Sequence, residues 1–137
     1  MRYCDLHCDA LTASGALQVT AERLAAGGCL LQCFAAFVGE GGFARFCLLA
    51  DKYDAMCERE GYHRVLCASD VREDAVNALF TSEGGTFATL EELEGLYERG
   101  VRMAGFVWNT PTGAGFPNFP EDTGLCAGRV SPSAREG

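Results

Sequence analysis

The segment Cys29–Val38 is the sequence feature that most limits which folds this chain can adopt. Its ten residues are apolar except for Gln32, and a glycine follows at once. A strand with one face in water alternates apolar and polar residues, whereas a strand covered on both faces is apolar almost throughout. The segment therefore predicts a buried strand in a parallel sheet.

Apolar residues at spacings of three and four predict helices on both sides of this strand. Residues 43–60 carry one continuous apolar stripe, with charged residues outside it. A short helix is predicted over 20–28, which opens on a threonine and closes on two glycines. A third is predicted over 89–100, which begins with the Thr-x-x-Glu spacing of a capping box. Residues 69–73 have the composition of a fourth, very short helix.

Further segments have the length and composition of strands. They are residues 3–9, 77–82 and 101–107, with 64–68 as a shorter candidate. Strands that alternate with helices indicate βαβ units, whose strands run parallel in one sheet. The chain is therefore predicted to be a single α/β domain.

Polar side chains gather where the predicted strands end. His7 and Asp9 lie two residues apart and so share one face of the first strand, while Glu83 follows a later one. Trp108 and Asn109 follow the last strand. In α/β barrels the chemistry takes place at the carboxyl ends of the strands.

These residue types suit a metal such as zinc, which binds both imidazole nitrogen and carboxylate oxygen. Each also has a plain structural interpretation. His7 and Asp9 alone could be a polar strand end, and Glu83 with the two glycines after it could be a turn with an exposed carboxylate. The residues alone leave both interpretations open.

Charge and composition exclude some classes of function. The formal net charge of -8 disfavours a nucleic-acid partner, because little would neutralise the phosphates. The longest apolar segment, Cys29–Val38, is far shorter than the roughly 20 residues that span a bilayer. Without a secretory signal, a cytoplasmic location without membrane attachment is expected, and the eight cysteines are expected to be reduced.

The character of the chain changes after Asn109. All four prolines lie in Thr110–Gly137, and no periodicity is visible there. Residues 1–125 are expected to form the domain and residues 126–137 a disordered tail.

Taken in order, the strand ends resemble the N-terminal part of the membrane dipeptidase (renal dipeptidase) family, metal-dependent dipeptidases of the amidohydrolase type. Six short segments carry the resemblance over residues 3–125. They are Leu6–Leu11, Gly27–Ala36, Ser82–Gly85, Leu96–Arg102, Val107–Thr110 and Gly124–Leu125.

The resemblance implies a (β/α)8 barrel that holds two zinc ions and hydrolyses dipeptides with a metal-activated water. It implies that His7 and Asp9 bind one ion and that Glu83 bridges both. By the same resemblance Trp108 and Asn109 lie where the substrate binds.

The chain departs from this family in its extent. A whole barrel takes about 250 residues, whereas this chain has 137. The histidines of the second metal, the substrate-binding arginine and a late aspartate have no counterpart here. The expected fold is therefore an incomplete (β/α)8 barrel with about four parallel strands and connecting helices.

The missing part of the barrel also determines the activity that we expect. We expect a truncated dipeptidase that binds zinc at most partly and is inactive alone. Two alternatives stay open. The chain could be half of a hydrolase completed by a second chain or a second copy that covers the open sheet edge. It could also be a small α/β domain without enzymatic activity.

Overall fold

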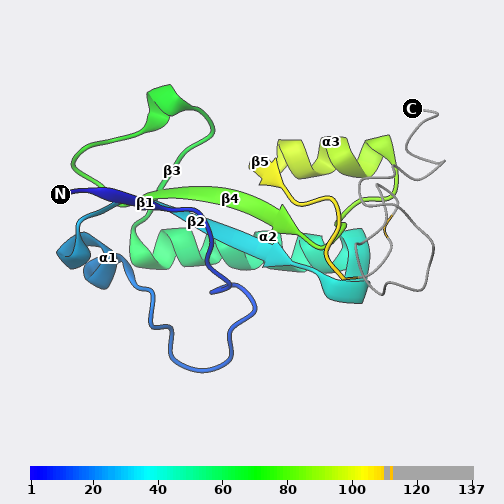
Figure 1. The fold of residues 1–137 in the computed structure, drawn as a ribbon, viewed down its shortest axis with the longest axis horizontal. Coiled ribbons are helices and arrows are strands. Elements are labelled where there is room, and N and C mark those ends of the chain that lie inside the picture. The colour runs from blue at the N-terminus through cyan, green and yellow to red at the C-terminus, as the bar shows by residue number, and fades with distance from the viewer. Residues whose placement is uncertain (110–111, 113–137) are drawn as a thin grey trace.

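The computed structural model describes residues 1–109 and 112, which form a parallel sheet with helices packed on it (Figure 1). The predictions for residues 110–111 and 113–137, including the tail over 126–137, lie outside the described residues. In chain order the elements are β1 (Tyr3–Asp5), α1 (Ala21–Gly27), β2 (Cys29–Phe37), the 3-10 turn η1 (Gly39–Gly41), α2 (Gly42–Glu60), β3 (His63–Arg64), the 3-10 turn η2 (Ala68–Asp70), β4 (Asn77–Glu83), α3 (Leu90–Glu98) and β5 (Val101–Ala104).

Every strand pair in the sheet is parallel, which confirms the predicted α/β class. β4 is central and pairs with β2 along its whole length, from Leu31 opposite Asn77 to Phe37 opposite Glu83. β1 lies on the outer side of β2, and β3 and β5 pair with successive parts of the other edge of β4. All carboxyl ends therefore point to the same end of the sheet, as in part of a barrel.

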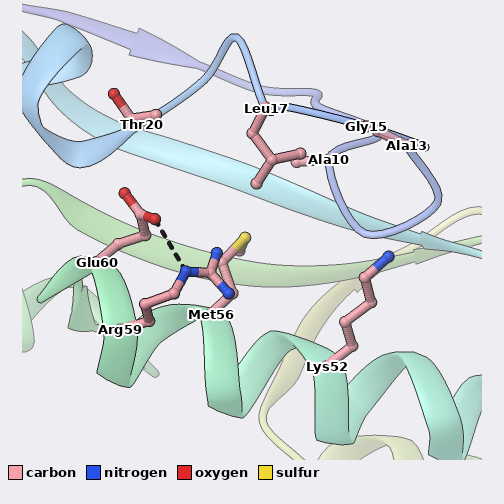
Figure 2. A pocket seen from close by; sticks show the side chains of 9 residues that line it. All are labelled: Ala10, Ala13, Gly15, Leu17, Thr20, Lys52, Met56, Arg59 and Glu60. Atoms are coloured by element: carbon pink, nitrogen blue, oxygen red, sulfur yellow. Dashed lines mark hydrogen bonds and ion pairs between the residues drawn. The ribbon is translucent and has the colours of Figure 1, made fainter.

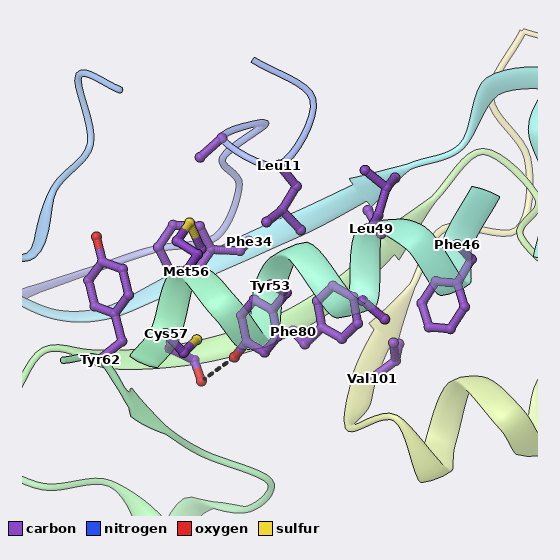
Figure 3. Close-up of a cluster of buried hydrophobic side chains, with 14 of the residues drawn as sticks. Leu11, Phe34, Phe46, Leu49, Tyr53, Met56, Cys57, Tyr62, Phe80 and Val101 are labelled. Carbon is purple, nitrogen blue, oxygen red and sulfur yellow. Dashed lines mark hydrogen bonds between the residues drawn. The ribbon is translucent and has the colours of Figure 1, made fainter. Parts of the chain in front are cut away.

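One apolar core joins the helices to the sheet. Phe80 of β4 stacks on Tyr53 of α2, with ring centroids 4.3 Å apart, and also on Phe46 of the same helix at 5.6 Å (Figure 3). Leu24 of α1 and Leu96 of α3 belong to the same cluster. The hydroxyl of Tyr53 donates to the Ala78 carbonyl, so its one polar group is satisfied inside the core. The helices thus cover one face of the sheet.

The predicted helix over 43–60 is confirmed, and its αL cap is Gly61 with φ of 74°. The helices predicted over 20–28 and 89–100 are confirmed as well, and both begin at a threonine N-cap. Within the described part of the chain, no helix is long and apolar enough to span a bilayer.

We expect Thr89→Ala to lower the free energy of unfolding by about 1 kcal/mol, the usual effect of losing an N-cap side chain. The Thr89 hydroxyl accepts a hydrogen bond from the Glu92 amide at 3.2 Å. Chemical denaturation checks this value, and Thr89→Ser is the control because it keeps the hydroxyl. Equal stability of the alanine and wild-type chains would show that the cap contributes nothing.

The strand predicted over 64–68 is wrong in its extent, because β3 has only two residues, His63 and Arg64. The Asp70 carboxylate accepts hydrogen bonds from the amides of Leu66 and Cys67, which removes the donors that a longer strand would pair. The helix predicted over 69–73 is likewise replaced by the turn η2.

His63 is the first residue of β3. It is partly buried, and its Nε2 lies 2.8 Å from the Asp70 carbonyl oxygen. It therefore helps to hold the segment after β3 in place.

Candidate metal centre

Three side chains of the predicted ligand set meet at the carboxyl end of the sheet. The Nε2 atom of His7 lies 3.2 Å from Asp9 Oδ2 and 3.6 Å from Glu83 Oε2. One ligand atom from each residue lies within 4.8 Å of the others. Among the described residues this is the only such group of three. The structure thus brings together all three residues that the sequence singled out as metal ligands.

The two distances from His7 Nε2 suit ligands that share one metal ion. Zinc binds nitrogen and oxygen ligands at about 2.0–2.2 Å, so a tetrahedral ion separates its ligand atoms by about 3.4 Å. The two distances from His7 Nε2, 3.2 and 3.6 Å, lie on either side of this value. One imidazole and two carboxylates also form a donor set that zinc accepts.

The strand that carries His7 and Asp9 is shorter than predicted. The sequence indicated a strand over 3–9, but β1 ends at Asp5. The Asp5 carboxylate accepts a hydrogen bond from the His7 amide at 3.1 Å, which turns the backbone locally as aspartates often do. The two ligands therefore lie on the segment after the strand rather than on the strand itself.

This segment still follows the neighbouring strand. The Ala35 amide of β2 donates to the Cys8 carbonyl at 2.9 Å, so the chain stays beside the sheet. The Cys8 side chain packs against the core. Burial raises the pKa of the Cys8 thiol, which keeps it protonated.

The turn that follows Glu83 packs closely against the side chain of Thr112. Glu83 is the last residue of β4, and Gly84 and Gly85 follow with φ of 88° and 71°. A Cβ built on Gly85 would lie 2.0 Å from Cγ2 of Thr112. The segment after β5 therefore packs directly against the turn that follows Glu83.

We expect Gly85→Ala to destabilise the fold more than Gly15→Ala does. Both glycines have a positive φ, which costs an L-residue about 1–2 kcal/mol. Only the alanine at 85 also collides with Thr112, since nothing lies within 4 Å of a Cβ at Gly15. Denaturation of both variants measures the difference. Equal losses would mean that the approach of Thr112 does not constrain the turn.

Trp108 lies beside the ligand cluster. Its ring packs edge-on against Phe37, with centroids 5.2 Å apart, and Phe37 pairs in register with Glu83. About half of the Trp108 surface is exposed. Asn109 is exposed at the end of the described range.

The strand predicted over 101–107 is also too long, because β5 ends at Ala104. The Gly105 amide still donates to the Ser82 carbonyl at 2.8 Å, and beyond it the chain leaves the sheet. The Phe106 carbonyl accepts from the Thr112 hydroxyl rather than from a strand. Trp108 and Asn109 therefore lie on a loop above the strand end.

Sequence reasoning missed two residues of the site. A cleft of ≈ 320 Å³ opens beside His7 and Glu83, and Thr81 and Met103 are among the residues that line it. Thr81 is two residues before Glu83 and so shares its face of β4, and Met103 pairs with Thr81 in register. The period of two could have indicated Thr81. The position of Met103 depends on the register of β5, which only the structure gives.

Two solved structures share this fold. One is an amidohydrolase from Pseudomonas aeruginosa, with a TM-score of 0.77, 18% identity, and coverage of 97% of this chain and 40% of that chain. The other is the dipeptidase AC, a metallopeptidase of family M19, with a TM-score of 0.74, 21% identity, and coverage of 97% of this chain and 51% of that chain. The fold of this chain is that of part of a (β/α)8 barrel.

The two solved structures test the sequence-based resemblance as a likeness of fold. The predicted partial (β/α)8 barrel is confirmed, and one of the structures that share it is a metallopeptidase of the expected type. This partial barrel spans about half or less of the length of the two structures. No family model matches the chain, and no curated protein matches it.

Proposed function

We propose that the chain carries the first half of the metal centre of a zinc-dependent dipeptidase. The observation that carries this proposal is the convergence of His7, Asp9 and Glu83, whose ligand atoms lie within 4.8 Å of one another at the carboxyl end of the sheet. Clustered ligands at this end of a parallel sheet are typical of barrel enzymes. The two structures that share the fold are named as an amidohydrolase and a metallopeptidase.

Each residue has a distinct part in this proposal. His7 and Asp9 hold one zinc ion, and Glu83 offers two carboxylate oxygens, so it can reach a second. Zinc, when bound, supplies a water of lowered pKa and polarises a carbonyl. Trp108 contributes an apolar wall beside the cluster, and Asn109 an amide that can hydrogen-bond the substrate backbone. Solvent reaches the site, because the side chains of His7 and Asp9 are 53% and 56% exposed.

The proposed centre needs ligands beyond these three. The sequence holds one other histidine, His63, and its ring is engaged with the Asp70 carbonyl. We therefore propose that polypeptide completing the barrel supplies them, through contact with the sheet edges. The 137 residues by themselves should bind zinc weakly and should not hydrolyse dipeptides.

A chimera tests the function. Residues 1–109 replace the equivalent segment of dipeptidase AC, and hydrolysis of a simple dipeptide is measured with added zinc. We expect metal-dependent turnover, and we expect none from the same chimera with Glu83→Gln, which keeps size but removes the charge. A folded chimera that binds zinc and fails to turn over would contradict the proposed function. Turnover that persists with Glu83→Gln would contradict the role of Glu83.

A further inference from the structure

A second cavity lies away from the proposed metal centre. It has a volume of ≈ 430 Å³ and opens between the loop that follows Asp9 and the C-terminal half of α2 (Figure 2). Ligand pockets commonly have volumes of about 300–1,000 Å³ and combine apolar walls with a few polar groups. This cavity has both properties.

The charged groups come from one side of α2. Lys52, Met56, Arg59 and Glu60 line the cavity at spacings of four, three and one residues, so successive turns of the helix face it. Across from them, Ala10 and Leu17 line the cavity from the loop, and Met56 and Ala10 are buried. The cavity thus has apolar walls with charged groups on the helix side.

The charged groups favour a single negative charge. Two cations and one carboxylate line the cavity, and the chain as a whole carries a net charge of -8. Arg59 uses its Nε to contact Glu60 at 3.1 Å, and its guanidinium extends toward Met56 (Figure 2). The Arg59 side chain is 59% exposed, and no protein acceptor for its two Nη groups is present within the described residues. A planar guanidinium binds carboxylates with two parallel hydrogen bonds. Glu60 beside it would repel a dianion such as phosphate.

We infer that this cavity binds a small amphiphilic monocarboxylate, with its carboxylate on Arg59 and its apolar part between Met56 and Leu17. Lys52 adds to the positive potential. Its Nζ also donates to the Leu11 carbonyl and so holds the loop. A substitution of Lys52 would therefore disturb the loop, and Arg59 is the better residue to substitute. The inference does not depend on the proposed metal chemistry.

Octanoate is the probe, and amide chemical shifts of the metal-free, ¹⁵N-labelled full chain are the readout. We expect saturable shifts at loop residues 13–20, and we expect Arg59→Gln to weaken binding about tenfold, as for a lost charge-assisted contact. Arg45→Gln is the matched control, since Arg45 lies on α2 outside the cavity and the charge change is the same. Its affinity should stay close to that of the unchanged chain.

Octylamine separates recognition of the carboxylate from simple apolar binding, because it has the same tail and the opposite charge. It should give no saturable shifts at residues 13–20. Equal affinity for octanoate and octylamine would overturn the inference. Unchanged octanoate affinity in an Arg59→Gln chain with native thermal stability would also overturn it. Chemical-shift changes confined to the exposed residues Met103, Phe106 and Trp108 would overturn it as well.

Discussion

The His7→Ala variant should lose zinc affinity by more than the 10–100-fold that follows removal of an outer-shell partner, because it removes a direct ligand. His7 Nε2 is the atom that both carboxylates approach, at 3.2 and 3.6 Å. Without it, Asp9 and Glu83 leave an all-carboxylate site, which zinc binds less well than a mixed one. A competition titration with a chromophoric chelator measures the affinity.

His63→Ala is the matched control for this prediction. It removes the other histidine of the chain, which lies partly buried against Asp70 and outside the ligand cluster. Zinc affinity should not change in this variant. Equal losses for both histidines, or no loss for His7→Ala, would place the bound zinc elsewhere, with the exposed thiols of Cys4 and Cys67 as the first candidates.

Phe80→Ala should lower the free energy of unfolding by about 3–5 kcal/mol, the range for aromatic residues truncated in a core. Phe80 is 1% exposed and stacks on both Tyr53 and Phe46, so the truncation leaves a cavity between β4 and α2 (Figure 3). Domains of this size are stable by only about 5–15 kcal/mol, so this loss removes a large part of the stability of the fold. Thermal and urea unfolding measure the loss.

Phe106→Ala is the control for this core prediction. Phe106 is 58% exposed and contacts Phe87 edge-on. Its truncation should cost less than about 1 kcal/mol, as expected for a surface position. Similar losses for Phe80→Ala and Phe106→Ala would show that the contact between β4 and α2 does not dominate the stability.

The sequence was sufficient to predict the elements whose signals are local. The apolar run of β2, the stripe of α2 and the threonine caps of α1 and α3 depend on residues within the same element. The sequence failed where a side chain from elsewhere takes up backbone donors. Asp70 binds the amides of Leu66 and Cys67, and no pattern within the 64–68 segment signals this.

The candidate site also combines features that could be predicted from the sequence with features that could not. The family resemblance implied that His7, Asp9 and Glu83 would share a metal site, and residues that follow the carboxyl ends of parallel strands do lie at one end of the sheet. The sequence did not predict that β1 would end at Asp5, since that depends on one hydrogen bond to the His7 amide. The place of Met103 beside Thr81 depends on strand register, which includes an irregularity between Phe80 and Thr81.

X-ray absorption at the zinc edge of the zinc-loaded chain tests the metal site most directly. The eight cysteines make sulfur ligation a real competitor, and sulfur is distinguished by its longer bond. Ligation by His7, Asp9 and Glu83 predicts scattering from nitrogen and oxygen at about 2.0–2.2 Å, with an imidazole signature that His7→Ala removes. A shell of sulfur at about 2.3 Å, unchanged in His7→Ala, would contradict the account.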